Sequence, residues 1–225
     1  YHRSKGKAER FRFVGRERGY HGMNIGCISV GGMINNVKTF ASVLMPGVQH
    51  MRHTHLPEHK FVSGQPETGA DLADDLERIA TNFGPENIAA CIVEPIAGST
   101  GTLVPPKGYL QKLRDTCDKH GILLIFDEVI TGWGRTGSAF ASHEFGVTPD
   151  IMTMAKATTN GVVPMGVVAC KDEIYDAVMD ASPLGSVELF HGYTYSGIPV
   201  AVAAALAVQD IFEKEDIFER AKNLA

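Results

Sequence analysis

The sequence lacks several features that define whole classes of protein. None of its apolar runs reaches the ~18 consecutive residues of a membrane-spanning helix, and its first residues do not form a signal-peptide pattern. Basic residues do not predominate, because the formal net charge is -5. Electrostatics therefore offers no reason to expect a nucleic acid or an anionic membrane as a partner. We expect a cytoplasmic protein that binds neither.

Cysteine is scarce, and its spacing excludes the common cysteine-based sites. The chain has four cysteines without a CxxC pair. Cys91 and Cys170 lie within apolar runs, where we expect buried, reduced thiols. A disulfide framework is not expected in a chain of this length, which again indicates a cytosolic compartment.

Two further motifs are incomplete. The segment HMRHTHLPEH, residues 50–59, contains four histidines but neither an HExxH pattern nor an adjacent cluster of cysteines or acids. We expect a polar surface excursion there and no metal site. The glycines of SVGGM and GWGRTG do not form the GxGxxG fingerprint after a strand, so a Rossmann-type oxidoreductase is disfavoured.

What the chain does contain is a regular alternation of apolar runs and amphipathic stretches. We expect strands over residues 11–17, 88–95, 122–129, 149–156 and 163–170. We expect helices over residues 70–83, 108–120, 171–180 and 198–215, and a long irregular excursion over 37–70. This alternation predicts an α/β fold with a mostly parallel sheet and helices on both faces. In such sheets, ligands bind at the carboxyl ends of the strands.

Two charged residues follow apolar strands at that edge. Asp127 ends the run in IFDEV, and Lys156 follows the apolar residues of PDIMTMAK. The segment between them is long enough to leave one strand and return on its neighbour. A lysine and an aspartate that converge in this way suit pyridoxal phosphate (PLP). The lysine forms a Schiff base with PLP, and the acid keeps the pyridine nitrogen protonated.

Each of these residues also has a simpler interpretation. Asp127 could cap the turn after its strand, and a lone lysine usually lies on the solvated surface. The small, flexible residues after Lys156 and the apolar residues before it favour the functional interpretation. A lysine held out of water is a good nucleophile at neutral pH.

Five ordered segments extend the interpretation to most of the chain. They are YHG (20–22), VEPIAGSTG (93–101), GYLQKLRDTC through FDEVITGWGRTG (108–137), PDIMTMAK (149–156) and HGYTYSG (191–197). In this order they resemble the class III PLP-dependent aminotransferases, which are fold-type I enzymes. Within that class, RERGYHG, VEPIAGSTG and HGYTYSG are most similar to the ω-amino acid:pyruvate (β-alanine–pyruvate) transaminases.

The resemblance implies a role for several residues. Lys156 would hold the cofactor and then move the proton at the substrate Cα, while Asp127 would pair with the pyridinium nitrogen. Val129 and Tyr20 would press against the two faces of the ring. Glu94 would lie behind Asp127.

Three more residues enter through the same resemblance. His21 and Gly22 complete the tyrosine motif, although His21 could equally be a structural hydrogen-bond partner. Thr194 would bind the cofactor phosphate of the neighbouring subunit, which implies an obligate homodimer with a shared active site. In the GWGRTG loop, Trp133 is expected to pack, and Arg135 to fix the loop by donating to backbone carbonyls.

The sequence departs from the family at two places. Many relatives that use α-ketoglutarate have a glutamate where this chain has Ser99, which favours pyruvate as the amino acceptor. The segment after the lysine has Ala157 followed by Thr158 and Thr159, where many relatives have a Gly-Leu pair or similar. This second change leaves the role of the lysine intact.

The resemblance also implies missing parts. We expect residues 1–225 to form an incomplete large PLP-binding domain. An N-terminal segment with a Gly-Ser phosphate loop would lie outside the chain, as would a C-terminal small domain with a substrate-binding arginine. The predicted function is transamination of a β- or ω-amino acid or amine to pyruvate. The alternatives are another fold-type I reaction (an aminomutase, racemase or decarboxylase) or a non-catalytic fragment.

Overall fold

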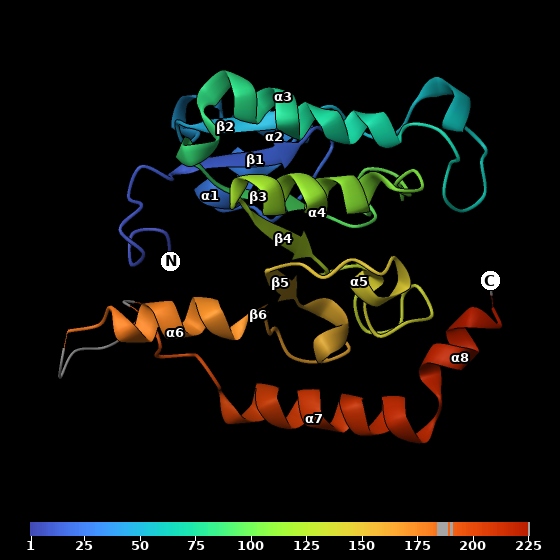
Figure 1. Cartoon of the computed structure of the whole chain (residues 1–225). Helices are drawn as coiled ribbons and strands as arrows, with labels where there is room; N and C mark the ends of the chain where they lie inside the picture. Colours follow the sequence, from blue (N-terminus) through green and yellow to red (C-terminus); the bar gives the residue numbers. More distant parts are fainter. Residues whose placement is uncertain (184–188, 190, 225) are drawn as a thin grey trace.

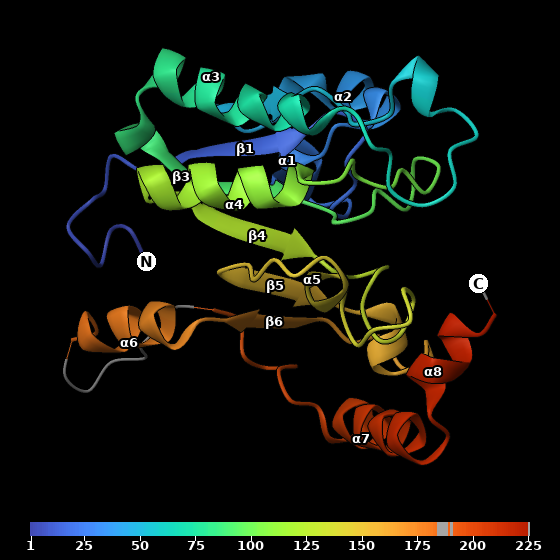
Figure 2. The same ribbon diagram turned by 45° about the vertical axis from the view of Figure 1, so that its right-hand side comes forward.

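A single twisted sheet organises the chain (Figures 1 and 2). The computed structural model describes residues 1–183, 189 and 191–224. In this part the sheet has the strand order β2-β1-β3-β4-β5-β6. The strands are β1 (Arg12–Arg16), β2 (Val48–Met51), β3 (Ile88–Val93), β4 (Leu123–Asp127), β5 (Ile151–Met154) and β6 (Val167–Cys170). Neighbours from β2 to β5 are parallel, and β6 is antiparallel to β5. The predicted α/β fold with a mostly parallel sheet is confirmed.

Helices connect and flank these strands. They are α1 (Ile25–Val30), α2 (Ile34–Thr39), α3 (Asp74–Phe83), α4 (Tyr109–His120), α5 (Ala141–Glu144), α6 (Asp172–Asp180), α7 (Pro199–Lys214) and α8 (Ile217–Lys222). Single 3-10 turns span Ala41–Val43, Pro57–His59, Ala70–Ala73, Pro85–Asn87 and Lys156–Thr158. Within the described residues, no helix combines the length and apolar composition needed to cross a bilayer.

The core lies between the sheet and the pair α3 and α4, which run side by side over one face (Figures 1 and 2). Leu76 of α3 and Leu113 of α4 are fully buried there, together with Leu124 and Phe126 of β4. Burial of each such side chain contributes roughly 1.5–3 kcal/mol. Because Leu124 and Phe126 alternate along β4, the strand is fixed in register with its last residue, Asp127, at the carboxyl edge of the sheet.

A glycine lets a helix cover the opposite face. Val14 of β1 faces the core, so the next residue, Gly15, points the other way. A Cβ atom on Gly15 would lie 2.0 Å from the carbonyl oxygen of Val30, the last residue of α1. Only glycine permits this approach, and helices therefore lie on both faces of the sheet.

The predicted irregular excursion over residues 37–70 is wrong in part. It contains β2, which pairs with β1 as an edge strand, and the end of α2. The strand VQHM is short and half-buried, so it carries no strong apolar pattern. Helix α1 was also not predicted, although Asn24 caps it by accepting a hydrogen bond from the Cys27 amide at 2.9 Å.

The expectation for the cysteines is half correct. Cys91 is fully buried in β3, whereas Cys170 is exposed. Strand β6 lies at the edge of the sheet, and its last three residues are exposed in the described structure. An apolar run at a sheet edge therefore does not guarantee burial.

Candidate active site

The ends of β4 and β5 bring the two predicted charged residues to one edge of the sheet. The strands are parallel neighbours, with Asp127 paired to Thr153. Asp127 is the last residue of β4, and Lys156 begins a 3-10 turn just after β5. The connection between the strands includes α5, as expected for parallel neighbours.

Most of the predicted site residues line one cavity of ≈ 270 Å³. The lining consists of Tyr20, His21, Gly22, Glu94, Asp127, Val129, Ile130 and Lys156. Ile130 is the one member that the sequence did not predict. Thr194 is not part of this lining and lies in an exposed turn before α7.

Asp127 is held by a histidine and by the backbone. His21 Nδ1 lies 2.8 Å from Asp127 Oδ2, and the side chains are only 2% and 8% exposed respectively. The Val129 amide donates to Asp127 Oδ1 at 3.1 Å. His21 Nε2 is buried and has no hydrogen-bond partner among the described residues. The carboxylate is thus fixed in direction before any ligand binds.

Glu94 fixes the loop that carries Tyr20. It follows β3, and its two carboxylate oxygens accept from the amides of Tyr20 and Gly98, each at 2.9 Å. Burial raises the pKa of Glu94, and the two amide donors oppose that rise. Glu94 therefore joins two loops of the cavity wall, to whose lining it also contributes.

Two buried charges that support the site were not singled out from the sequence. The Arg16 guanidinium, at the end of β1, donates to the carbonyl oxygen of Glu94 at 2.8 Å. Glu128 is fully buried and accepts from the Ser142 and Ala141 amides at the start of α5. The sequence did contain a signal for Glu128, which directly follows Asp127 at a strand end. Because successive side chains of a strand face opposite sides, two adjacent acids there point in opposite directions. Only the contacts reveal the role of Arg16.

Lys156 differs from the sequence-based expectation in one respect. We expected a desolvated lysine, but its side chain is exposed in the described chain. Besides the first cavity, it lines a second hollow of ≈ 530 Å³ together with Pro164 and Met165. Its backbone is left-handed, with φ of 45°, which is a strained conformation for a residue with a Cβ atom.

The GWGRTG loop packs beside the lysine turn. The Trp133 ring stacks on Phe212 of α7 and meets the edge of Phe140, with centroids 5.9 and 5.1 Å away. Trp133 is therefore a packing residue, as expected, and its indole also donates to Thr158 Oγ1 at 2.9 Å. Arg135 is exposed, and its expected hydrogen bonds to loop carbonyls do not form with any described residue.

The histidine-rich segment is bound to the backbone and is not wholly a surface excursion. His59 is buried, with its ring 3.1 Å from the carbonyl oxygen of Thr54. His50 Nε2 lies 2.8 Å from the carbonyl oxygen of Gly31. Across the described ranges, histidine, cysteine and acidic side chains do not gather in groups of three or more that could hold a metal ion.

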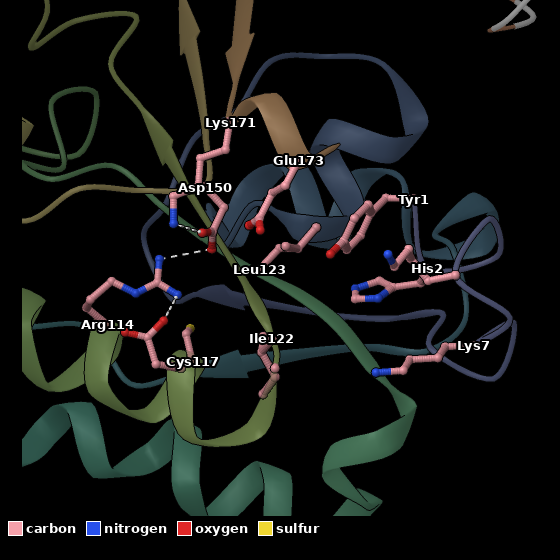
Figure 3. Close-up of a pocket in the computed structure, with 13 residues that line it drawn as sticks. Tyr1, His2, Lys7, Arg114, Cys117, Ile122, Leu123, Asp150, Lys171 and Glu173 are labelled. Atoms are coloured by element: carbon pink, nitrogen blue, oxygen red, sulfur yellow. Dashed lines mark hydrogen bonds and ion pairs between the residues drawn. The ribbon is translucent and has the colours of Figure 1, made fainter. Parts of the chain in front are cut away.

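A further, polar cavity of ≈ 230 Å³ lies at the amino ends of β4 and β5, across the sheet from the first cavity (Figure 3). Asp150, which precedes β5, accepts from the Leu124 amide at 2.7 Å and pairs with Arg114 at 2.9 Å and Lys171 at 2.6 Å. Burial pushes the pKa of Asp150 upward, but these three donors outweigh it and the pKa is lowered. The cluster joins β4, α4 and the start of α6, which is a structural role.

The groups around the first cavity suit a flat aromatic cofactor that carries a ring nitrogen and an aldehyde. Asp127 supplies an oriented carboxylate, and Lys156 supplies a primary amine. Tyr20 and Val129 supply an aromatic and an aliphatic wall. The cavity volume also suits a single ring, so PLP fits the residues that are present.

Comparison with known proteins yields close relatives. The family model described as "Aminotransferase class-III" matches residues 1–225. An omega-aminotransferase of Caulobacter vibrioides is 58% identical over 225 residues, and a beta-alanine–pyruvate aminotransferase of Pseudomonas aeruginosa is 48% identical over 227 residues. Both alignments cover 100% of this chain, and they cover 51% and 50% of the relatives. The chain therefore spans about half the length of these relatives.

Solved structures show the same similarity. The omega transaminase of Pseudomonas jessenii, in complex with PMP, superimposes with a TM-score of 0.88 at 38% identity. The match covers 97% of this chain and 48% of that one.

Proposed function

Because the chain belongs to the class-III aminotransferases, we propose that the protein uses PLP bound at Lys156 to move an amino group to pyruvate. The donor would be a β- or ω-amino acid or an amine. One observation carries this proposal: Lys156 and the His21–Asp127 pair converge on a single cavity that Tyr20 and Val129 also line.

The chemistry of the proposed reaction depends on a proton that is moved at the substrate Cα. When bound, PLP would act as the electron sink for that step. Asp127 would hold the proton on the ring nitrogen, and His21 would keep the Asp127 carboxylate pointed at it. The Lys156 amine would first hold the cofactor and, once released by the incoming amino group, would act as the base at Cα.

The remaining residues would bind and orient the ring. Tyr20 and Val129 would confine it between an aromatic and an aliphatic side chain, which excludes water from both faces. Glu94 would fix Tyr20 through its backbone amide. Gly22, which has φ of 112°, would allow the loop to turn close beside the ring.

Several parts of the proposal reach beyond this chain. We propose that residues 1–225 form most of the large cofactor domain of a longer polypeptide. The fact that the chain spans about half the length of its relatives supports this assignment. The exposed Thr194 would bind the cofactor phosphate of a partner subunit in a homodimer. Ser99, in place of a glutamate, supports pyruvate over α-ketoglutarate as the acceptor.

The proposal is tested with the full-length protein in an assay for alanine formed from β-alanine and pyruvate. We expect alanine, and a much slower reaction when α-ketoglutarate replaces pyruvate. A cofactor-loaded protein that forms no alanine from β-alanine or from a panel of ω-amines would contradict the transaminase proposal. Racemised, decarboxylated or isomerised amino acid in place of alanine would identify one of the alternative fold-type I reactions.

A further inference from the structure

The turn that begins with Lys156 is held from outside by a neighbouring loop. The turn's own backbone supplies several bonds, among them the Thr158 amide donating to the carbonyl oxygen of Ala155 at 2.9 Å and the Gly161 amide donating to that of Lys156 at 3.0 Å. They close a turn in which Lys156 has a φ of 45°. A residue in this conformation persists only where its surroundings hold it.

Thr158 connects the turn to a tryptophan. Its buried hydroxyl donates to the carbonyl oxygen of Ala155 at 3.0 Å and accepts from Trp133 Nε1 at 2.9 Å. The accepted bond leaves the hydroxyl hydrogen directed at Ala155, the residue immediately before Lys156. The indole thereby orients the donor that closes the lysine turn.

Trp133 is itself rigidly placed. Its amide donates to the carbonyl oxygen of Ala139 at 2.6 Å, and its ring is confined by Phe140 and Phe212. The loop starts at Glu128, directly after Asp127, and the carbonyl oxygen of Glu128 accepts from the Gly132 amide at 2.8 Å. A continuous set of contacts therefore runs from the Asp127 strand end to the Lys156 turn.

We propose that Trp133 is a positioning residue for Lys156, acting through the Thr158 hydroxyl, and that this pair sets where the lysine amine stands relative to Asp127. The inference rests on the proposed function, since it concerns the amine that would hold the cofactor. Trp133 does not line the cavity and acts only through the turn. Its indole N–H thus has a role in addition to the packing of its ring.

The test separates the hydrogen bond from the packing in the full-length, cofactor-loaded protein. Trp133→Phe keeps an aromatic ring but removes the N–H. Thr158→Val removes the hydroxyl at nearly constant size, and Thr158→Ser keeps it. The readouts are the pH midpoint of the absorbance of the lysine-bound cofactor, kcat and KM for pyruvate, and the melting temperature.

We expect Trp133→Phe and Thr158→Val each to shift the pH midpoint and to lower kcat about tenfold, the effect of losing one well-placed hydrogen bond. KM for pyruvate should stay within about twofold, because neither residue of the pair lines the cavity. Thr158→Ser should behave as the wild type. The double variant Trp133→Phe/Thr158→Val should be no worse than either single one, since both remove the same link.

A wild-type midpoint and kcat in both Trp133→Phe and Thr158→Val would overturn the inference while leaving the proposed function intact. A lower melting temperature in these variants, with midpoint and kcat unchanged, would also overturn it, because Trp133 would then only pack. If the wild-type protein itself shows no lysine-bound cofactor absorbance, the proposed function fails and the inference falls with it.

Discussion

His21 Nδ1 and Asp127 Oδ2 lie 2.8 Å apart at the carboxyl edge of the sheet, with both side chains almost fully withdrawn from solvent. Asp127 belongs to β4 and His21 to a loop more than a hundred residues earlier in the chain. A carboxylate held in this way does not have to be oriented by a ligand. The pair therefore gives the strongest structural reason to assign a chemical role to this edge of the sheet.

The two adjacent acids at the end of β4, Asp127 and Glu128, are predicted to have separable roles. Asp127→Asn should lower kcat by roughly 10²–10³-fold, because a neutral amide cannot hold a proton on a ring nitrogen. Glu128→Gln should instead cost about 2 kcal/mol of stability, because a buried acceptor of the α5 amides is lost, and should retain kcat. Steady-state kinetics and thermal unfolding of both variants check this. The same loss of kcat in both would contradict the assignment.

The proposed stacking role of Tyr20 depends on its ring and not on its hydroxyl. Tyr20→Phe should therefore bind the cofactor as the wild type does. Tyr20→Leu should bind it about tenfold more weakly, since aromatic pairing contributes about 0.5–1.5 kcal/mol beyond the buried area. Equilibrium titration of the apo-protein with PLP measures both constants. Equal affinities for the leucine and phenylalanine variants would exclude stacking by Tyr20.

Asp150 gives a prediction for the dependence of stability on pH. Its pKa is lower in the folded than in the unfolded protein, so the cluster stabilises the fold above the ordinary aspartate pKa of about 3.9. That stability is lost as the pH falls through the lower, folded pKa. Asp150→Asn should cost about 3 kcal/mol at neutral pH, since Arg114 and Lys171 lose their charged partner.

Chemical unfolding of the Asp150 variant at several pH values checks the sign. The stability difference between wild type and Asp150→Asn should shrink below about pH 4, where the carboxylate of the unfolded chain takes up a proton, and should be gone once the pH has fallen below the lower pKa of the folded protein. A difference that stays constant from neutral to acidic pH would show that ionisation of Asp150 does not contribute.

Gly15 is predicted to be irreplaceable because of the approach of α1. Gly15→Ala should destabilise the protein by about 3 kcal/mol, since its Cβ atom would overlap the Val30 carbonyl oxygen, which is part of the backbone. Gly26→Ala, within α1, is the matched control: its Cβ atom would lie 3.6 Å or more from its neighbours. There alanine should be neutral or gain up to about 1 kcal/mol through helix propensity. Comparable losses in both variants, measured by chemical unfolding, would contradict the packing argument.

The sequence predicted those parts of the molecule that depend on local pattern. Asp127 and Lys156 follow apolar strands, and the carboxyl ends of parallel strands meet at one edge, so their convergence follows from the topology. The amphipathic helix α4 and its glycine terminus could be found in the same way. The family resemblance added Tyr20 and Val129, which share the cavity.

The remaining features depend on contacts between distant segments. Strand β2 is short and becomes a strand only by pairing with β1. The support that Arg16 gives to Glu94 crosses from β1 to β3. The bond from Trp133 to Thr158 joins two loops, and an indole donor cannot be assigned a partner from sequence spacing. The exposure of Lys156 likewise depends on where its turn lies in the folded chain, which sequence pattern does not reveal.

Lys156 is proposed to carry the cofactor. This role is tested most directly by reducing the full-length, PLP-loaded protein with borohydride and mapping the attached group by peptide mass spectrometry. Reduction fixes the cofactor on the lysine that holds it. We predict the added mass on the peptide that contains Lys156 and its absence from Lys156→Ala. Attachment to another lysine, or no attachment in the wild-type protein, would contradict the account.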